Sequence, residues 1–120
     1  MCTVTFIPRS TGYYLAMNRD EQLSRVAGLP PTPRIINGRT VICPAEPSGG
    51  TWIALNDCFV SFALINWYSV PARVKDKPIS RGEVVNAISA DSSFKLADAH
   101  LARLPLDRIN PFRLIGFFPE

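Results

Sequence analysis

The hydrophobic and polar positions in the first half of the chain follow the pattern of β-strands. Residues 3–7 alternate between polar and apolar side chains, and residues 13–17 form an apolar run after a short glycine-containing turn. Two such runs around a short turn predict a β-hairpin. Asn37-Gly38 lies between two further apolar runs, and this dipeptide is the strongest short-range hairpin signal. It predicts a second hairpin over residues 34–43.

The rest of the first half predicts a loop and two more strands. Residues 19–33 are charged at first and then rich in proline, which is typical of a loop. The runs at residues 51–55 and 58–65 are rich in β-branched and aromatic side chains, so they predict strands. Asn56 and Asp57, which lie between these runs, are ordinary turn formers.

Helical spacing replaces the strand pattern in the second half. Apolar residues spaced three and four apart predict helices near residues 80–91 and 95–104. Ser80 followed by Glu83 is the signature of a capping box at the start of the first helix. An apolar run at residues 112–118 predicts a returning strand.

This order of elements predicts an α+β fold, with an antiparallel sheet over residues 2–66 formed before the helices. A chain of 120 residues with 47% hydrophobic and 19% charged residues is expected to fold as one domain, residues 1–120. No apolar run approaches the roughly 20 residues that cross a bilayer, so we expect no transmembrane segment.

The last predicted strand lies very close to the end of the sequence. Four of its large apolar side chains have little chain after them to cover them, namely Phe112, Leu114, Ile115 and Phe117. Burial of one such side chain stabilises a protein by about 1.5–3 kcal/mol, so leaving several exposed would be costly. We therefore expect the chain to be the N-terminal part of a longer domain, and to self-associate when isolated.

Charge and cysteine content exclude several classes of function. Lys and Arg number 13 against 10 Asp and Glu, and they are scattered along the chain, so no basic cluster predicts nucleic-acid binding. Three separated cysteines and a single histidine, His100, supply neither a disulfide framework nor a zinc-binding motif. We expect no metal or cofactor. Because the first residues lack a secretory signal and the cysteine count is odd, we expect a cytoplasmic protein with free thiols.

Cys2 is the first candidate for chemistry. Initiator methionine is usually removed before a small residue, which would leave a thiol and a free α-amine on Cys2. The amine has a reference pKa of about 7.7–8.0, so it can accept the thiol proton near neutral pH, and the two groups form a complete nucleophile and base. The alternative is that Cys2 is a small apolar residue at the start of a strand.

Three polar segments are further candidates. The charged run at residues 18–21 follows a predicted strand, where a carboxylate could hold an N-terminal amine, and the alternative is a solvated turn. Gly49-Gly50 would let the backbone pass close to a ligand or simply form a tight turn. Asn66 follows a predicted buried strand, where its amide could donate to a developing oxyanion or merely end the strand.

Taken together and in this order, these segments resemble one family. The sequence is similar to the NRDE family, also called the transport and Golgi organisation protein 2 family, in four motifs: Met1-Cys2, Asn18-Arg19-Asp20-Glu21, Gly49-Gly50-Thr51-Trp52 and Ala63-Leu64-Ile65-Asn66. The family resembles the N-terminal nucleophile hydrolases, particularly the choloylglycine hydrolase and penicillin V acylase group. That resemblance implies an αββα sandwich of two antiparallel sheets between helices.

The resemblance also implies roles for individual residues. Cys2 would be the nucleophile of an amide hydrolase acting on a small non-peptide substrate, Asp20 would hold its α-amine, and Asn66 would contribute to the oxyanion hole. Asn18 and Arg19 would bind substrate at the rim. The acylases have an arginine just before this segment, whereas here Arg19 lies inside it. The alternative function is a non-catalytic binding or trafficking protein for haem or a lipid-derived ligand.

Overall fold

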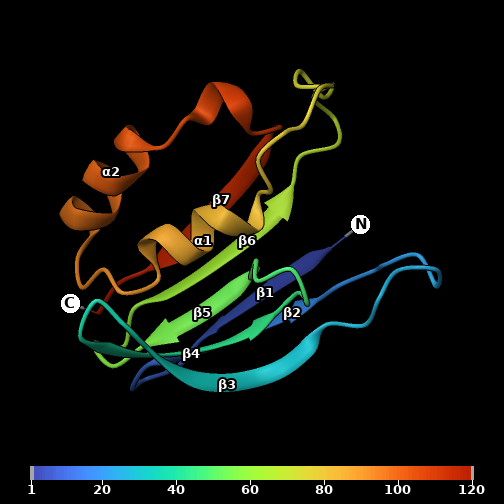
Figure 1. The fold of residues 1–120 in the computed structure, drawn as a ribbon. Helices are drawn as coiled ribbons and strands as arrows, with labels where there is room; N and C mark the ends of the chain where they lie inside the picture. The colour runs from blue at the N-terminus through green and yellow to red at the C-terminus, as the bar shows by residue number, and fades with distance from the viewer. Residues whose placement is uncertain (1, 120) are drawn as a thin grey trace.

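The structure, a computed structural model, describes residues 2–119, and in these residues the strands form two antiparallel sheets (Figure 1). The smaller sheet is a hairpin of β1 (Thr3–Pro8) and β2 (Tyr13–Asn18). The larger sheet has its five strands side by side in chain order, namely β3 (Leu29–Ile36), β4 (Arg39–Ala45), β5 (Ile53–Asn56), β6 (Ser61–Asn66) and β7 (Phe112–Phe117). Both predicted hairpins are confirmed. Residues 2–66 supply strands to both sheets rather than to the single sheet expected from the sequence.

The prediction of a loop throughout residues 19–33 is wrong at its end, because β3 begins at Leu29 and contains three prolines. A proline cannot donate a backbone hydrogen bond, so within sheets it is confined to edges and bulges. Strand β3 is an edge strand, and its pairing with β4 shifts register between Leu29 and Thr32. The prolines are therefore tolerated, because an edge strand with an irregular register does not need a backbone hydrogen bond from each of its residues.

Helices occupy the second half of the chain, as predicted. Helix α1 (Gly82–Ile88) and helix α2 (Phe94–Arg103) are followed by a short 3-10 helix, η1 (Leu106–Arg108). No helix within residues 2–119 has the length and apolar character needed to cross a membrane.

The predicted capping box at Ser80 is wrong. Arg81 occupies the N-cap position of α1, and the Ser80 hydroxyl accepts a bond from the backbone N–H of Gly82 at 3.2 Å. Helix α2 does begin with a side-chain cap, since the Ser93 hydroxyl accepts from the N–H of Leu96 at 3.3 Å. The sequence contains the capping-box motif at Ser80, but α1 begins one residue later than this motif predicts.

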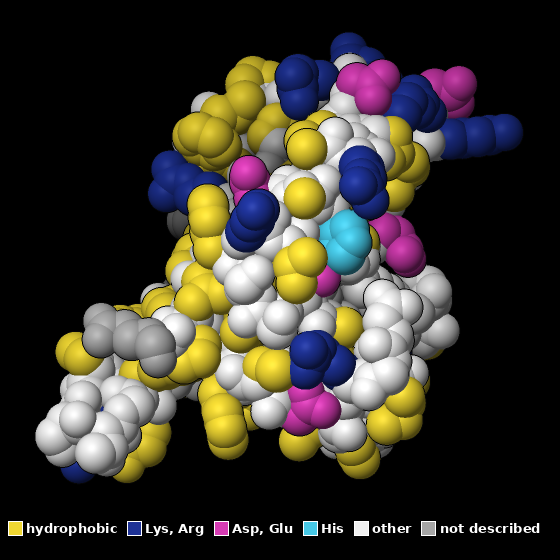
Figure 2. Space-filling view, turned by 90° about the vertical axis from the view of Figure 1, so that its left-hand side faces the viewer, with side chains coloured by type: hydrophobic (Ala, Val, Ile, Leu, Met, Phe, Trp, Pro, Cys, Tyr) yellow, Lys and Arg dark blue, Asp and Glu magenta, His cyan; other side chains and the backbone are white. Residues whose placement is uncertain are grey.

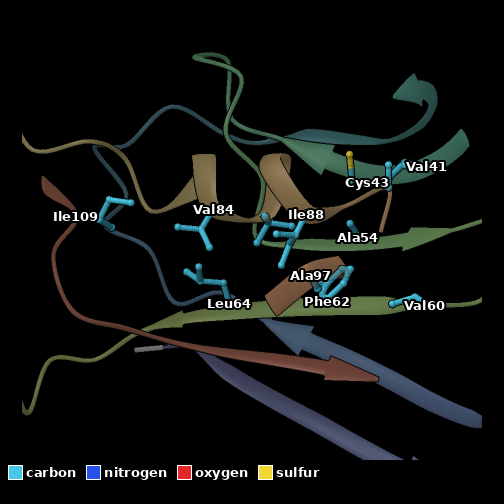
Figure 3. Packing of buried hydrophobic residues seen from close by; sticks show 12 residues of the cluster. Val41, Cys43, Ala54, Val60, Phe62, Leu64, Val84, Ile88, Ala97 and Ile109 are labelled. Carbon is cyan, nitrogen blue, oxygen red and sulfur yellow. The ribbon is translucent and has the colours of Figure 1, made fainter. Parts of the chain in front are cut away.

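The helices pack on one face of the five-stranded sheet and enclose the main hydrophobic core. Figure 3 shows Val84 and Ile88 of α1 beside Phe62 and Leu64 of β6. Alternate residues of β4, β5 and β6 point to this face, and the buried cluster that they form with the helices comprises Val41, Cys43, Ala54, Val60, Phe62, Leu64, Val84, Val85, Ile88, Ala90, Ala97 and Ile109. The α+β prediction is confirmed.

The β1–β2 hairpin lies on the opposite face of the same sheet. Phe6 stacks on Phe117 with ring centroids 4.6 Å apart, and Tyr13 tilts against Phe117 at 5.4 Å. The Tyr13 hydroxyl donates to the Ser61 hydroxyl at 2.7 Å. Along β6 and β7 these residues alternate with those that face the helices, so these two strands are covered on both sides.

The hairpin and the helices also cover β7 better than the sequence suggests. Phe112 and Leu114 pack against the helical core, and Phe117 stacks on Phe6. All four apolar side chains that were expected to lack cover, Ile115 included, are half-buried. The expectation that these side chains lack cover is therefore wrong, because the β1–β2 hairpin and the helices, which precede β7 in the chain, pack against it. Self-association stays a prediction.

The buried side chain of Asn56 joins the β5–β6 turn to the end of α1. Its Nδ2 donates to the carbonyls of Ser89 at 3.1 Å and Asp91 at 2.8 Å. Its Oδ1 accepts from the backbone N–H groups of Cys58 at 2.9 Å and Val60 at 3.2 Å. One side chain thus satisfies four backbone groups in a site where only 3% of its surface is exposed.

We predict that Asn56→Ala lowers the free energy of unfolding by at least about 3 kcal/mol, because it leaves several buried backbone groups without partners at about 1–3 kcal/mol each. Chemical denaturation monitored by circular dichroism measures the change. The matched control is Asn18→Ala on the exposed side of β2, expected within about 0.5 kcal/mol of the parent. Equal effects of the two substitutions would contradict the role of Asn56.

Asp57, in the turn between β5 and β6, contacts the start of β4. Its carboxylate accepts from the backbone N–H of Thr40 at 3.0 Å and lies 3.3 Å from the Arg39 guanidinium. The backbone bond from Thr40, assisted by Arg39, lowers the pKa of Asp57 below its ordinary value. The folded state therefore favours the ionised carboxylate, and this stabilisation is lost as the pH falls through the lowered pKa.

We predict that an NMR titration gives Asp57 a midpoint below its ordinary value of about 3.9. In Arg39→Gln the midpoint should rise but stay below that value, because the Thr40 N–H is the larger cause. A midpoint at or above the ordinary value in the parent protein would contradict this account. Asp57→Asn should make the stability less dependent on pH in the acid range.

Candidate functional site

The β1–β2 hairpin brings Cys2 and Arg19 to the same end of the molecule. The pairing of Thr3 with Asn18 is the last of the hairpin register, and Cys2 and Arg19 are the next residues beyond this end of the ladder. Side chains alternate along a strand, and Cys2 and Arg19 therefore share the inward face with Phe6. Both side chains are half-buried, whereas Asn18 is exposed.

A pocket of about 210 Å³ lies at this end, and both Cys2 and Asn66 line it. Asn66 is the last residue of β6, a central strand of the large sheet. Arg19 and Trp52 line the same pocket, as do residues 78–82 before and at the start of α1. The structure thus brings together three of the residues identified from the sequence, Cys2, Arg19 and Asn66.

The other two candidates are placed differently. Asp20 is exposed, follows Arg19 directly, and lies outside the set of residues that line the pocket. Asn18 points to the outer side of the hairpin, because it is one position out of phase with Met17 and Arg19. Asn18 is not among the residues that line the pocket, and its role in substrate binding stays a prediction.

Arg19 is held in the wall of the pocket by several contacts. Its Nη2 lies 2.5 Å from Glu21 Oε1 and 2.6 Å from Glu46 Oε1, and its guanidinium stacks over Trp52 at 3.7 Å. Arg25 pairs with the same two carboxylates at 3.0 and 3.6 Å. With two glutamates and an indole ring around it, Arg19 has the surroundings of a structural residue that shapes the pocket.

Gly50 and Gly82 meet where the β4–β5 loop touches the start of α1. A Cβ atom on Gly82 would lie 2.8 Å from Gly50 Cα and 3.1 Å from the Thr51 nitrogen, and both are backbone atoms that cannot turn aside. Asn86 of α1 also donates to the Gly49 carbonyl at 2.9 Å. The paired glycines therefore permit close packing of a loop on a helix, and this packing forms part of the pocket wall.

The remaining wall is polar. The Arg81 Nε donates to the Pro111 carbonyl at 2.9 Å, and the side chain lines the pocket. The Asn66 Nδ2 donates to the Tyr68 hydroxyl at 2.7 Å. A primary amide carries two N–H groups, so this bond uses only one of them. Asn66 can hold Tyr68 and still offer a donor to a ligand.

Sequence reasoning missed three of the pocket residues, namely Glu46, Trp52 and Arg81. Trp52 belongs to a motif noted in the sequence, but nothing nearby in the chain indicated its stacking on Arg19. Glu46 directly follows a strand that is buried at its end, which is the one local signal that could have marked it. Among residues 2–119, no three His, Cys, Asp or Glu side chains are grouped so that they could hold a metal ion.

A second hollow lies between the hairpin and the open part of the large sheet. It has a volume of about 780 Å³ and is mostly apolar, with Tyr13 and Leu15 of β2 on one side and Ile42 and Leu55 on the other. Ile42 and Leu55 are 47% and 41% exposed although they lie on strands. We call this hollow the apolar groove.

One family model matches the sequence. The family model for Transport and Golgi organisation 2 matches residues 1–118. Searches of curated proteins and of solved structures found no match. Because the family model covers nearly the whole chain, including the segments that form the pocket, this protein belongs to the Transport and Golgi organisation 2 family.

Proposed function

We propose that the protein is an amide hydrolase that uses Cys2 as an N-terminal nucleophile. The observation that carries this proposal is that Cys2 and Asn66, which are far apart in the sequence, line the same small pocket. A thiol that attacks a carbonyl needs a hydrogen-bond donor for the oxygen that becomes negative. The pocket contains both groups.

The reaction would begin after removal of Met1. The α-amine of Cys2 takes the thiol proton, and the sulfur attacks the carbonyl carbon of the substrate to give a tetrahedral intermediate. The free N–H of the Asn66 amide stabilises the oxyanion. The protonated amine then gives its proton to the leaving nitrogen as the C–N bond breaks. Water, deprotonated by the same amine, hydrolyses the resulting thioester and releases the acid and the thiol.

In this proposal Asp20, two residues after the end of β2, would orient the amine, although its side chain is exposed and lies outside the residues that line the pocket. The pocket volume of about 210 Å³ supports a small substrate, since pockets for drug-sized ligands usually span about 300–1,000 Å³. Arg19 would contribute indirectly, because its contacts with Glu46 and Trp52 fix the wall against which the substrate lies.

We predict that Cys2→Ser abolishes hydrolysis of a panel of small N-acyl amides with a chromogenic amine, and that Asn66→Ala lowers kcat by about 10²–10³-fold. Release of the amine is followed by absorbance. The matched control is Cys58→Ser, since Cys58 is half-buried and lies outside the pocket lining. This control should hydrolyse the amides at the rate of the parent.

Two measurements separate this mechanism from a merely structural role. Intact mass spectrometry of protein from cells should show a chain that begins at Cys2. Iodoacetamide should label Cys2 faster than Cys43 or Cys58, and Asn66→Ala should leave that labelling rate unchanged. Retention of Met1 in the cellular protein would rule out the proposed mechanism, because Cys2 would then have no free amine.

The second candidate function is binding of haem or a lipid-derived molecule without catalysis. The apolar groove favours it, because the groove is large enough for such a ligand and its walls are mainly apolar. This function would not require the thiol of Cys2.

We predict that, if this second function holds, the protein gives a saturable change in haem absorbance that Leu55→Glu abolishes. Leu55 lines the groove, so the substitution places a charge where an apolar ligand would lie. The matched control is Leu23→Glu, since Leu23 is fully exposed outside the groove. Equal haem titrations for both variants would argue against the groove as the binding site.

A further inference from the structure

The charged side chains are unevenly distributed in space, although they are scattered along the sequence. Residues 67–81 and 106–113 together carry six of the 13 Lys and Arg residues but only two of the ten Asp and Glu residues. These two segments therefore have a net charge of +4, whereas the remaining seven cations and eight acids give the rest of the chain −1. The cations of the two segments are Arg73, Lys75, Lys77, Arg81, Arg108 and Arg113.

Direct contacts join the two segments into one surface. The Arg108 guanidinium donates to the carbonyls of Asp76 and Lys77 at 2.9 and 3.0 Å. The side-chain oxygen of Asn110 accepts from the backbone N–H of Arg73 at 3.0 Å. Figure 1 places the loop after β6 and η1 at the top of the molecule, and Figure 2 shows several Lys and Arg side chains at the top, with Asp and Glu side chains among them. We call this surface, formed by residues 67–81 and 106–113, the basic end.

Exposed aromatic and apolar side chains lie among these cations. Trp67, Tyr68 and Leu106 are 38%, 67% and 40% exposed, and Arg113 stacks over Trp67 at 4.8 Å. Trp67, Leu106 and Phe112 also line an apolar hollow of about 360 Å³. Trp and Tyr favour the boundary between lipid headgroups and acyl chains, because one part of each ring system is apolar and another forms hydrogen bonds.

We propose that the basic end binds the surface of a membrane that contains anionic lipids. Lys and Arg residues near such a surface are attracted to its negative potential, and each strengthens binding by about fivefold. The aromatic rings and Leu106 would enter the headgroup region, which adds a contribution that charge alone does not supply. The apolar hollow favours lipid over nucleic acid, since phosphate contacts need no apolar recess. Arg81 and Asn110 belong both to the basic end and to the lining of the Cys2 pocket, so the pocket lies next to the lipid contact.

Vesicle flotation of the full chain tests the proposal. We expect the protein to float with vesicles of equimolar phosphatidylcholine and phosphatidylserine at low salt, and to remain unbound with vesicles of phosphatidylcholine alone. High salt should release it, because exposed charges are then screened. Equal flotation with both kinds of vesicle, or flotation with neither, would overturn the proposal.

Matched variants locate the contact. Lys75→Gln with Lys77→Gln should weaken partitioning roughly 25-fold, at about fivefold per charge. The control is Lys95→Gln with Arg103→Gln on α2, where both residues are exposed and the loss of net charge is the same. The control should bind as the parent does. An equal loss in both double variants would mean that net charge alone acts, which would overturn the assignment to the basic end.

A third comparison distinguishes lipid from nucleic acid. Leu106→Gln removes an exposed apolar side chain and no charge, so it should weaken flotation with the mixed vesicles. A single-stranded oligonucleotide should compete poorly for the protein. If the oligonucleotide binds more tightly than the vesicles and Leu106→Gln changes neither interaction, the surface is a nucleic-acid site and the lipid proposal is wrong.

Discussion

The contact between the β1–β2 hairpin and the five-stranded sheet determines whether the candidate site exists. Phe6 and Tyr13 pack on Phe117, and the Tyr13 hydroxyl bonds to Ser61, so the hairpin is held by both apolar and polar contacts. Within residues 2–119, the hairpin shares no backbone ladder with the large sheet. Its position therefore depends on these side chains, and the position of Cys2 at its open end depends on them in turn.

The opposite wall of the pocket is fixed by α1, which is attached to the sheet near both of its ends. The close approach of Gly50 to Gly82 sets where the helix begins, and Asn56 binds the carbonyls that follow the helix. A seven-residue helix is too short to be stable alone, so such tertiary contacts maintain it. They also place Arg81, which reaches both the pocket and the basic end.

Patterns within a few neighbouring residues determined most of the secondary structure. Alternation at residues 3–7 and the Asn37-Gly38 dipeptide gave the two hairpins, since both signals act between residues that are adjacent or pair across a short turn. The positive φ angles of Asn37 and Gly38, 50° and 76°, are those that such a turn requires. Cys2 and Asn66, which the sequence singled out next to predicted strands, line the same pocket.

Only the tertiary structure decided which of these residues meet. The three prolines of β3 are acceptable because that strand lies at an edge, and the edge is defined by pairing with β4 rather than by local sequence. Side chains on and just after β2 alternate between the two faces of the hairpin. Packing of the hairpin on the large sheet decides which face is the inner one, and so leaves Arg19 half-buried and Asn18 exposed. Six of the 13 Lys and Arg residues, from two separate segments, lie at one end because the loop after β6 packs against η1. The sequence by itself determined most of the strands, the turns and the candidate thiol, amide and charged groups, since these depend on residues that are close together in the chain. The partners of those groups depend on contacts between distant segments, which local patterns do not encode.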